Sequence, residues 1–135
     1  MDMTVFDSMD AAALRRYVEF LLWHYRVVDA FWFIDVTEDY GQAAAEGLNE
    51  RVWERAGRMG ARAIVERFGV AAKGLDGFVK AQQLYPWCLL IGYCFDARDG
   101  EVILSVPSCP VQEARLRRGL GEYVCKEMHR REFAA

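Results

Sequence analysis

Three side chains near the end of the sequence have the types and spacing of a metal site. Glu122, Cys125 and His129 stand at i, i+3 and i+7 in a helical pattern, so a carboxylate, a thiol and an imidazole would share one helix face. Thiolate and neutral imidazole are ligands that suit zinc or iron. We therefore predict these three residues as metal ligands, with zinc or iron as the cofactor. In the alternative interpretation, Cys125 is a small buried apolar residue and His129 an exposed polar one.

Cys109 is a candidate catalytic nucleophile. It directly precedes Pro110, a residue favoured at the first position of a helix, so Cys109 is the predicted N-cap. The partial positive charge of a helix N-terminus stabilises a thiolate and raises its reactivity. The alternative is a purely structural cap, because the sequence shows no general base beside it. If one helix runs on from Pro110, Cys109 and Cys125 lie about 24 Å apart and cannot share a site.

The first helical segment places a carboxylate among aromatic residues. Asp29 lies three residues before Trp32, on the same helix face. Such a carboxylate must pair with a cation such as Arg26, accept hydrogen bonds, or face a cavity where its pKa rises. Apolar sites with a few polar groups are typical of small-molecule binding. We predict an aromatic-lined pocket, with these residues as ligand contacts: Asp29, Trp32, Glu38 and Asn49.

Helical periodicity predicts most of the elements that carry these residues. Asp10 is a good N-cap for a helix over residues 11–38, and a second helix follows over residues 42–69. Gly57 and Gly60 favour a kink or a split in the second helix. A short helix capped by Asp76 is expected within residues 74–84, and a last one from Pro110 to the end of the chain.

The pattern changes from helix to strand at residue 87. Residues 87–95 and 102–106 are rich in β-forming residues, and the Asp99-Gly100 pair between them is typical of a turn, so we predict a β-hairpin. Two strands alone are marginal in water, so either a partner subunit or sequence beyond residue 135 is expected to add strands. The predicted fold class is α+β, mostly helical, with four to five helices and a small antiparallel sheet in one domain over residues 1–135.

Composition narrows the class of protein. The chain has 135 residues, 53% of them hydrophobic, enough for one globular domain. Its net charge of −3 lacks the basic excess of nucleic-acid binders. The most apolar segment, residues 20–36, is interrupted by charged residues, and the N-terminus lacks the features of a secretory signal. We therefore expect a cytoplasmic protein with free thiols, in which Cys88 and Cys94 are core residues, and no nucleic-acid or membrane partner.

Several short segments resemble a family of uncharacterised prokaryotic cytosolic proteins, grouped near the L-2-amino-thiazoline-4-carboxylic acid hydrolases. The residues that carry the resemblance are Asp29 to Phe33, Glu38, Gly41, Leu48-Asn49, Ser108 to Pro110, Gly121 to Lys126 and His129. The order of elements is also similar to the small-molecule-binding domain of vinyl-reductase-like proteins, which implies a helix-covered antiparallel sheet and a dimer.

Three functions follow as hypotheses. The leading one is binding of a small organic molecule in the aromatic-lined pocket. The second is a metal- or thiol-dependent hydrolase-like enzyme that uses Cys109 or the Cys125/His129 pair. The third is a structural subunit of a homodimer, and a homodimer is expected in the other two cases as well.

Overall fold

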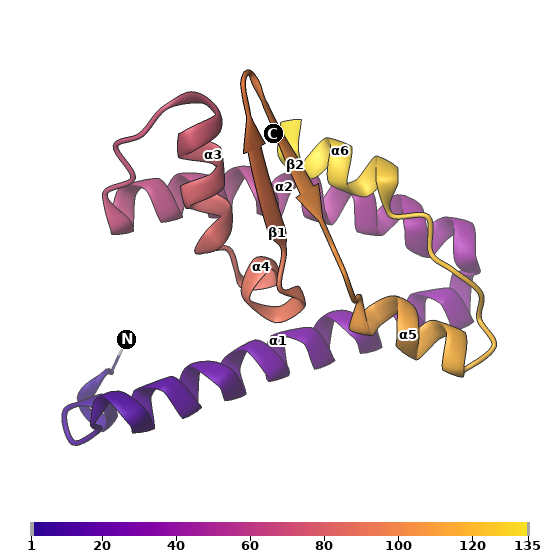
Figure 1. Cartoon of the computed structure of the whole chain (residues 1–135). Coiled ribbons are helices and arrows are strands. Elements are labelled where there is room, and N and C mark those ends of the chain that lie inside the picture. Colours follow the sequence, from indigo (N-terminus) through magenta and orange to yellow (C-terminus); the bar gives the residue numbers. More distant parts are fainter. Residues whose placement is uncertain (1, 135) are drawn as a thin grey trace.

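The computed structural model describes residues 2–134 and has the mostly helical α+β fold that the sequence predicts (Figure 1). A 3-10 turn, Thr4–Phe6, precedes the helices. The elements that follow are α1 Ala11–Tyr40, α2 Gln42–Phe68, α3 Gly74–Gln83, α4 Pro86–Ile91, β1 Cys94–Arg98, β2 Glu101–Ser105, α5 Pro110–Arg117 and α6 Lys126–Ala134.

The two long helices form where predicted. The Asp10 carboxylate caps α1 by accepting the Ala13 N–H at 2.7 Å. Gly41, with φ of +85°, separates α1 from α2. However, α2 is one helix and not two, so the predicted split at its inner glycines is wrong.

Close packing explains these inner glycines. A Cβ on Gly57 would lie 2.8 Å from the Glu132 carbonyl oxygen of α6. A Cβ on Gly60 would lie 2.8 Å from the Tyr85 ring. Both glycines therefore let other elements approach the α2 backbone, a gain that offsets their low helix propensity.

The segment predicted as the first strand begins instead as a helix. Pro86 occupies the first turn of α4, and Gly92 ends it in the left-handed conformation with φ of +74°. The strand β1 starts only at Cys94. A short apolar run does not distinguish helix from strand by periodicity, and here the flanking proline and glycine decide.

The hairpin itself is confirmed. β1 and β2 pair antiparallel with Cys94 opposite Ser105 and Arg98 opposite Glu101, and Gly100 turns the chain with φ of +78°. Within the described residues the sheet has these two strands. Cys94 is exposed on it, so the prediction that Cys94 is a core residue is wrong, whereas Cys88 is buried as expected.

The last predicted helix is broken in two. Gly119 and Gly121 both have positive φ, near +70°, and the chain is not helical between α5 and α6. The prediction of one continuous helix from Pro110 is therefore wrong. The 24 Å separation inferred from it for Cys109 and Cys125 does not apply.

The buried core lies between α2 and the elements that pack on it. Its apolar residues are Trp53, Ile64, Tyr85, Cys88 and Met128. α6 packs along α2. In the view of Figure 1, α1 lies below the other helices, and its N-terminal half extends past the rest of the molecule. None of the described residues of α1 is buried. Among residues 2–134, no helix has the length and hydropathy needed to cross a membrane.

Candidate functional site

A thiol, an imidazole and a carboxylate follow one another along α6. Cys125 directly precedes the helix, and its carbonyl oxygen accepts the His129 N–H at 3.0 Å. His129 and Glu132 lie four and seven residues later, on the face that Cys125 shares. The His129 Nδ1 atom is 3.2 Å from the Glu132 Oε2 atom, and the Cys125 thiol precedes His129 by about one helical turn on the same face. We call these three residues the thiol relay.

Contacts with α2 fix the position of α6 and bury the end of the relay. Met128 is buried between the helices, and Arg131 pairs with Glu50 at 3.3 Å and Glu54 at 3.6 Å. The Glu132 side chain is only 5% exposed because it packs where Gly57 leaves room. A buried carboxylate of this kind is stable when it faces a cation or a hydrogen-bond donor, which His129 supplies.

The relay perturbs the titration of its members. Interaction with the His129 side chain is the main factor that lowers the pKa of the Cys125 thiol. Burial lowers the pKa of His129, but interactions with Cys125 and Glu132 outweigh it and raise the pKa to about 9. Both effects favour a thiolate beside an imidazolium at neutral pH, the state in which a cysteine is nucleophilic.

Gln112 of α5 holds the segment that carries the thiol. The Tyr123 N–H donates to Gln112 Oε1 at 2.9 Å, and Gln112 Nε2 donates to the Tyr123 carbonyl oxygen. Interaction with the Gln112 side chain also contributes to the lowered pKa of Cys125. Sequence reasoning missed Gln112, because its role depends on the chain turning back between α5 and α6.

Asn49 lies close to this site. It is buried in α2 and donates to the Tyr123 hydroxyl and the Met128 sulfur, both at 3.2 Å. Trp32 packs on Phe33 with ring centroids 6.1 Å apart, and Phe33 packs on Tyr123 at 5.5 Å. Of the four predicted ligand contacts, Asn49 thus contacts Tyr123 directly, and Trp32 is linked to it through the Phe33 ring.

The other two predicted contacts lie elsewhere on α1. Glu38 is exposed in the last turns of the helix. Asp29 is half-buried and pairs with no cation within residues 2–134, so the expected partner Arg26 does not neutralise it. Burial raises the pKa of Asp29 to about 6.

The predicted metal ligands are not all on one helix. Glu122 is exposed in the segment before α6, while Cys125 and His129 retain the predicted i, i+4 relation. Within residues 2–134, no three His, Cys, Asp or Glu side chains are arranged to hold a metal ion. Glu132 is the third member of the cluster instead, and its i+3 spacing from His129 is the signal that could have found it.

Cys109 is half-buried and caps α5, as predicted. Burial first, then the charges of neighbours that include Cys109 and Cys125, raises the pKa of the Tyr93 hydroxyl. Neither thiol takes part in a side-chain hydrogen bond within the described residues, but the titration of Cys125 is influenced by His129, one helical turn away.

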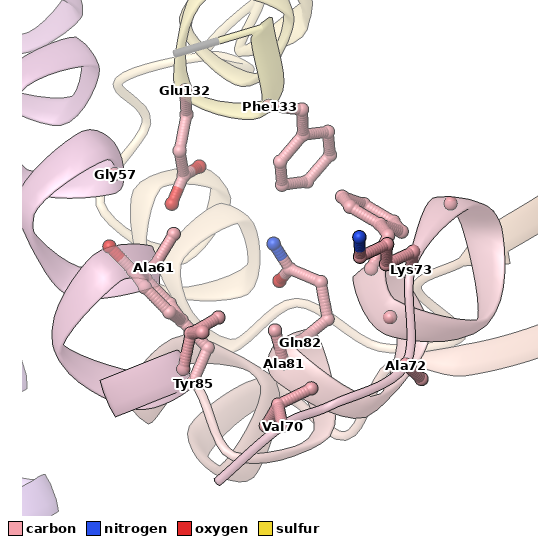
Figure 2. Close-up of a pocket in the computed structure, with 14 residues that line it drawn as sticks. Gly57, Ala61, Val70, Ala72, Lys73, Ala81, Gln82, Tyr85, Glu132 and Phe133 are labelled. Carbon is pink, nitrogen blue, oxygen red and sulfur yellow. The ribbon is translucent and has the colours of Figure 1, made fainter. Parts of the chain in front are cut away.

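A cavity of about 300 Å³ opens beside the buried end of the relay. It lies between α2, α3 and α6, and Figure 2 shows the side chains of Glu132, Phe133 and Gln82 around it. Small residues make up most of the α2 and α3 walls: Gly57, Ala61, Gly77 and Ala81. Asp29 and Trp32 do not line this cavity.

Comparison with known proteins places the chain in a family. No curated protein and no solved structure matches it. One family model matches residues 14–135, which include all of α1 except its first three residues and extend through the thiol relay. The chain belongs to this family, a family of unknown function designated DUF6125.

Proposed function

We propose that the protein is a thiol-dependent hydrolase of small organic molecules, with Cys125 as the nucleophile. The observation that carries this proposal is the alignment of Cys125, His129 and the buried Glu132 along one helix face, with His129 Nδ1 3.2 Å from Glu132 Oε2. Nucleophile, base and orienting carboxylate in this order are the signature of covalent catalysis. The resemblance to a family grouped near the L-2-amino-thiazoline-4-carboxylic acid hydrolases is in keeping with hydrolysis.

His129 takes part in both proton transfers that such a reaction needs. The Cys125 thiolate attacks an electrophilic carbon of the substrate and forms an S–C bond, while the His129 imidazolium gives its proton to the leaving group. Neutral His129 then takes a proton from water, which attacks the same carbon and releases the thiolate. Glu132 keeps the imidazole oriented in both states and stabilises the positive charge of the imidazolium.

The test is a search for the covalent intermediate with 4-nitrophenyl acetate. We expect a burst of one nitrophenolate per chain and an acetyl group on Cys125, located by mass spectrometry of peptides. Cys125→Ser removes the burst. Cys94→Ser, a change at an exposed cysteine outside the relay, keeps it. Acetylation of Cys109 or Cys94 in preference to Cys125 would contradict the proposal.

Binding of a small molecule near Asp29 is the second candidate function. It is favoured by the half-buried, unpaired carboxylate of Asp29 and by Tyr25, one helical turn before it, whose ring packs against Trp53 and Trp87. Replacing Asp29 with Ala should then weaken ligand binding more than folding. Unfolding alone would identify a structural residue.

We also propose a homodimer, in which the N-terminal half of α1 packs against a second copy. Leu14, Val18 and Leu21 follow the 4-3 spacing that leads to Tyr25, which contacts the body of the molecule through Trp53. The N-terminal half of α1 extends past the body (Figure 1), and the side chains of this apolar face are exposed there. A second copy of α1 would cover this face with apolar side chains at the same spacing.

A reducing compartment such as the cytoplasm suits an enzyme that depends on a free thiol.

A further inference from the structure

The cavity between α2, α3 and α6 is separate from the reacting thiol. Cys125 precedes α6, whereas Glu132 and Phe133, which line the cavity, lie in its last turns. Seven residues of helix separate Cys125 from Glu132, about 10 Å along the axis. A molecule in the cavity would therefore contact the relay at its carboxylate end.

One polar group dominates the inner wall. The Glu132 side chain is 5% exposed, and its Oε2 atom faces His129. The Oε1 atom accepts no hydrogen bond from the residues that the structure describes. Figure 2 shows the carboxylate directed into the cavity, with the Gln82 amide opposite it. A carboxylate oxygen that faces a cavity and receives no hydrogen bond from the protein is a strong acceptor for a charged N–H group.

The rest of the lining is apolar or already engaged. Ala61, Val70 and Phe78 offer carbon surface. The Tyr85 hydroxyl donates to the Ala56 carbonyl oxygen at 3.0 Å. Lys73 also lines the cavity, but it is exposed, so solvent screens its charge far more than that of Glu132.

We propose that this cavity binds a small molecule made of a protonated amine on an apolar body, with the amine on Glu132 Oε1. The size of about 300 Å³ is at the lower end for small-molecule sites, so the ligand is a compact one. Gln82 adds a polar contact from α3, and the small residues of α2 leave space for the apolar body. The inference goes beyond the proposed hydrolase, because it concerns a second site and needs no turnover.

Calorimetric titration with benzylamine, against benzyl alcohol of nearly the same shape, tests the proposal on the full chain. We expect benzylamine to bind about tenfold more tightly than the alcohol, because only the amine forms a charge-assisted hydrogen bond. Glu132→Gln should abolish this preference. Glu127→Gln, on the exposed face of the same helix, should preserve it.

A cavity-filling variant keeps the test decisive if Glu132→Gln does not fold. Ala61 is exposed and lines the cavity, so Ala61→Leu adds bulk there without removing a core contact. We expect it to weaken benzylamine binding about tenfold. Equal affinity of amine and alcohol for the wild type, or unchanged benzylamine binding in Ala61→Leu, would overturn the proposal. Neither result affects the acetylation of Cys125, so the two proposals fail separately.

Discussion

At the scale of single residues, the charge of the Cys125 thiol depends on one neighbour. His129→Ala removes the side-chain interaction and the positive charge that lower the pKa of Cys125, so that pKa should rise. We expect the rate of Cys125 alkylation by iodoacetamide at pH 6.5 to fall several-fold, and the two proteins to converge at pH values where every thiol is ionised. The rate at Cys94, measured in the same samples, is the internal control. Equal rates at pH 6.5 would mean that His129 does not activate the thiol.

Asp29 presents the opposite case, a carboxylate that burial disfavours. Its pKa is raised to about 6, above the unfolded value, so its contribution to stability is complete below about pH 4 and is lost as pH rises through 6. Asp29→Asn should remove this loss and stabilise the protein at pH 7 by about 2 kcal/mol. Urea denaturation at pH 4 and pH 7 measures the effect. Asp35→Asn, at an exposed carboxylate of the same helix, should change little.

At the scale of elements, the close packing of α6 against α2 requires a residue without a side chain at Gly57. Gly57→Ala places a Cβ 2.8 Å from the Glu132 backbone oxygen, so α6 must shift and the relay with it. We expect a loss of about 1–3 kcal/mol in thermal or urea unfolding, and slower alkylation of Cys125.

Gly47→Ala is the matched control on the same helix. The nearest atom to its new Cβ is the end of Arg51, at 3.7 Å, so no contact is broken. Higher helix propensity should then stabilise the protein by about 0.5–1 kcal/mol. Destabilisation by both substitutions, to a similar degree, would show that α2 does not tolerate alanine for reasons other than the contact with α6.

The elements also show where sequence patterns are sufficient. α1 and α2 are long, so their periodicity predicts them, and Asp99-Gly100 predicts the hairpin turn. α4 has six residues and its apolar pattern fits a strand equally well. The sequence predicts that Cys125 and His129 share a helix face, because i, i+4 spacing is a local property. It does not predict the burial of Glu132, because that burial depends on Gly57, a residue 75 positions away that packs against Glu132.

At the scale of the whole molecule, a large apolar surface remains on α1. Val18 is 48% exposed and Phe20 49%, and the overhanging half of the helix has apolar side chains on more than one face. Exposed apolar surface of this extent is typical of protein interfaces in soluble proteins. The two-stranded sheet is a further open surface within the described residues, since both strand edges lack partners there.

The proposed dimer is tested by a charge placed in this surface. Val18→Glu puts a carboxylate between Leu14 and Leu21, where a second α1 would bury it without a partner, so we expect dissociation into monomers. Sedimentation equilibrium of the wild type should give twice the mass of one chain. Met59→Glu, at a 73% exposed apolar residue of α2, should leave the dimer intact. A wild-type protein that is monomeric at a chain concentration of tens of micromolar would contradict the dimer. A dimer that persists in Val18→Glu would show that the interface is not on α1 and would direct the search to the open edges of the hairpin.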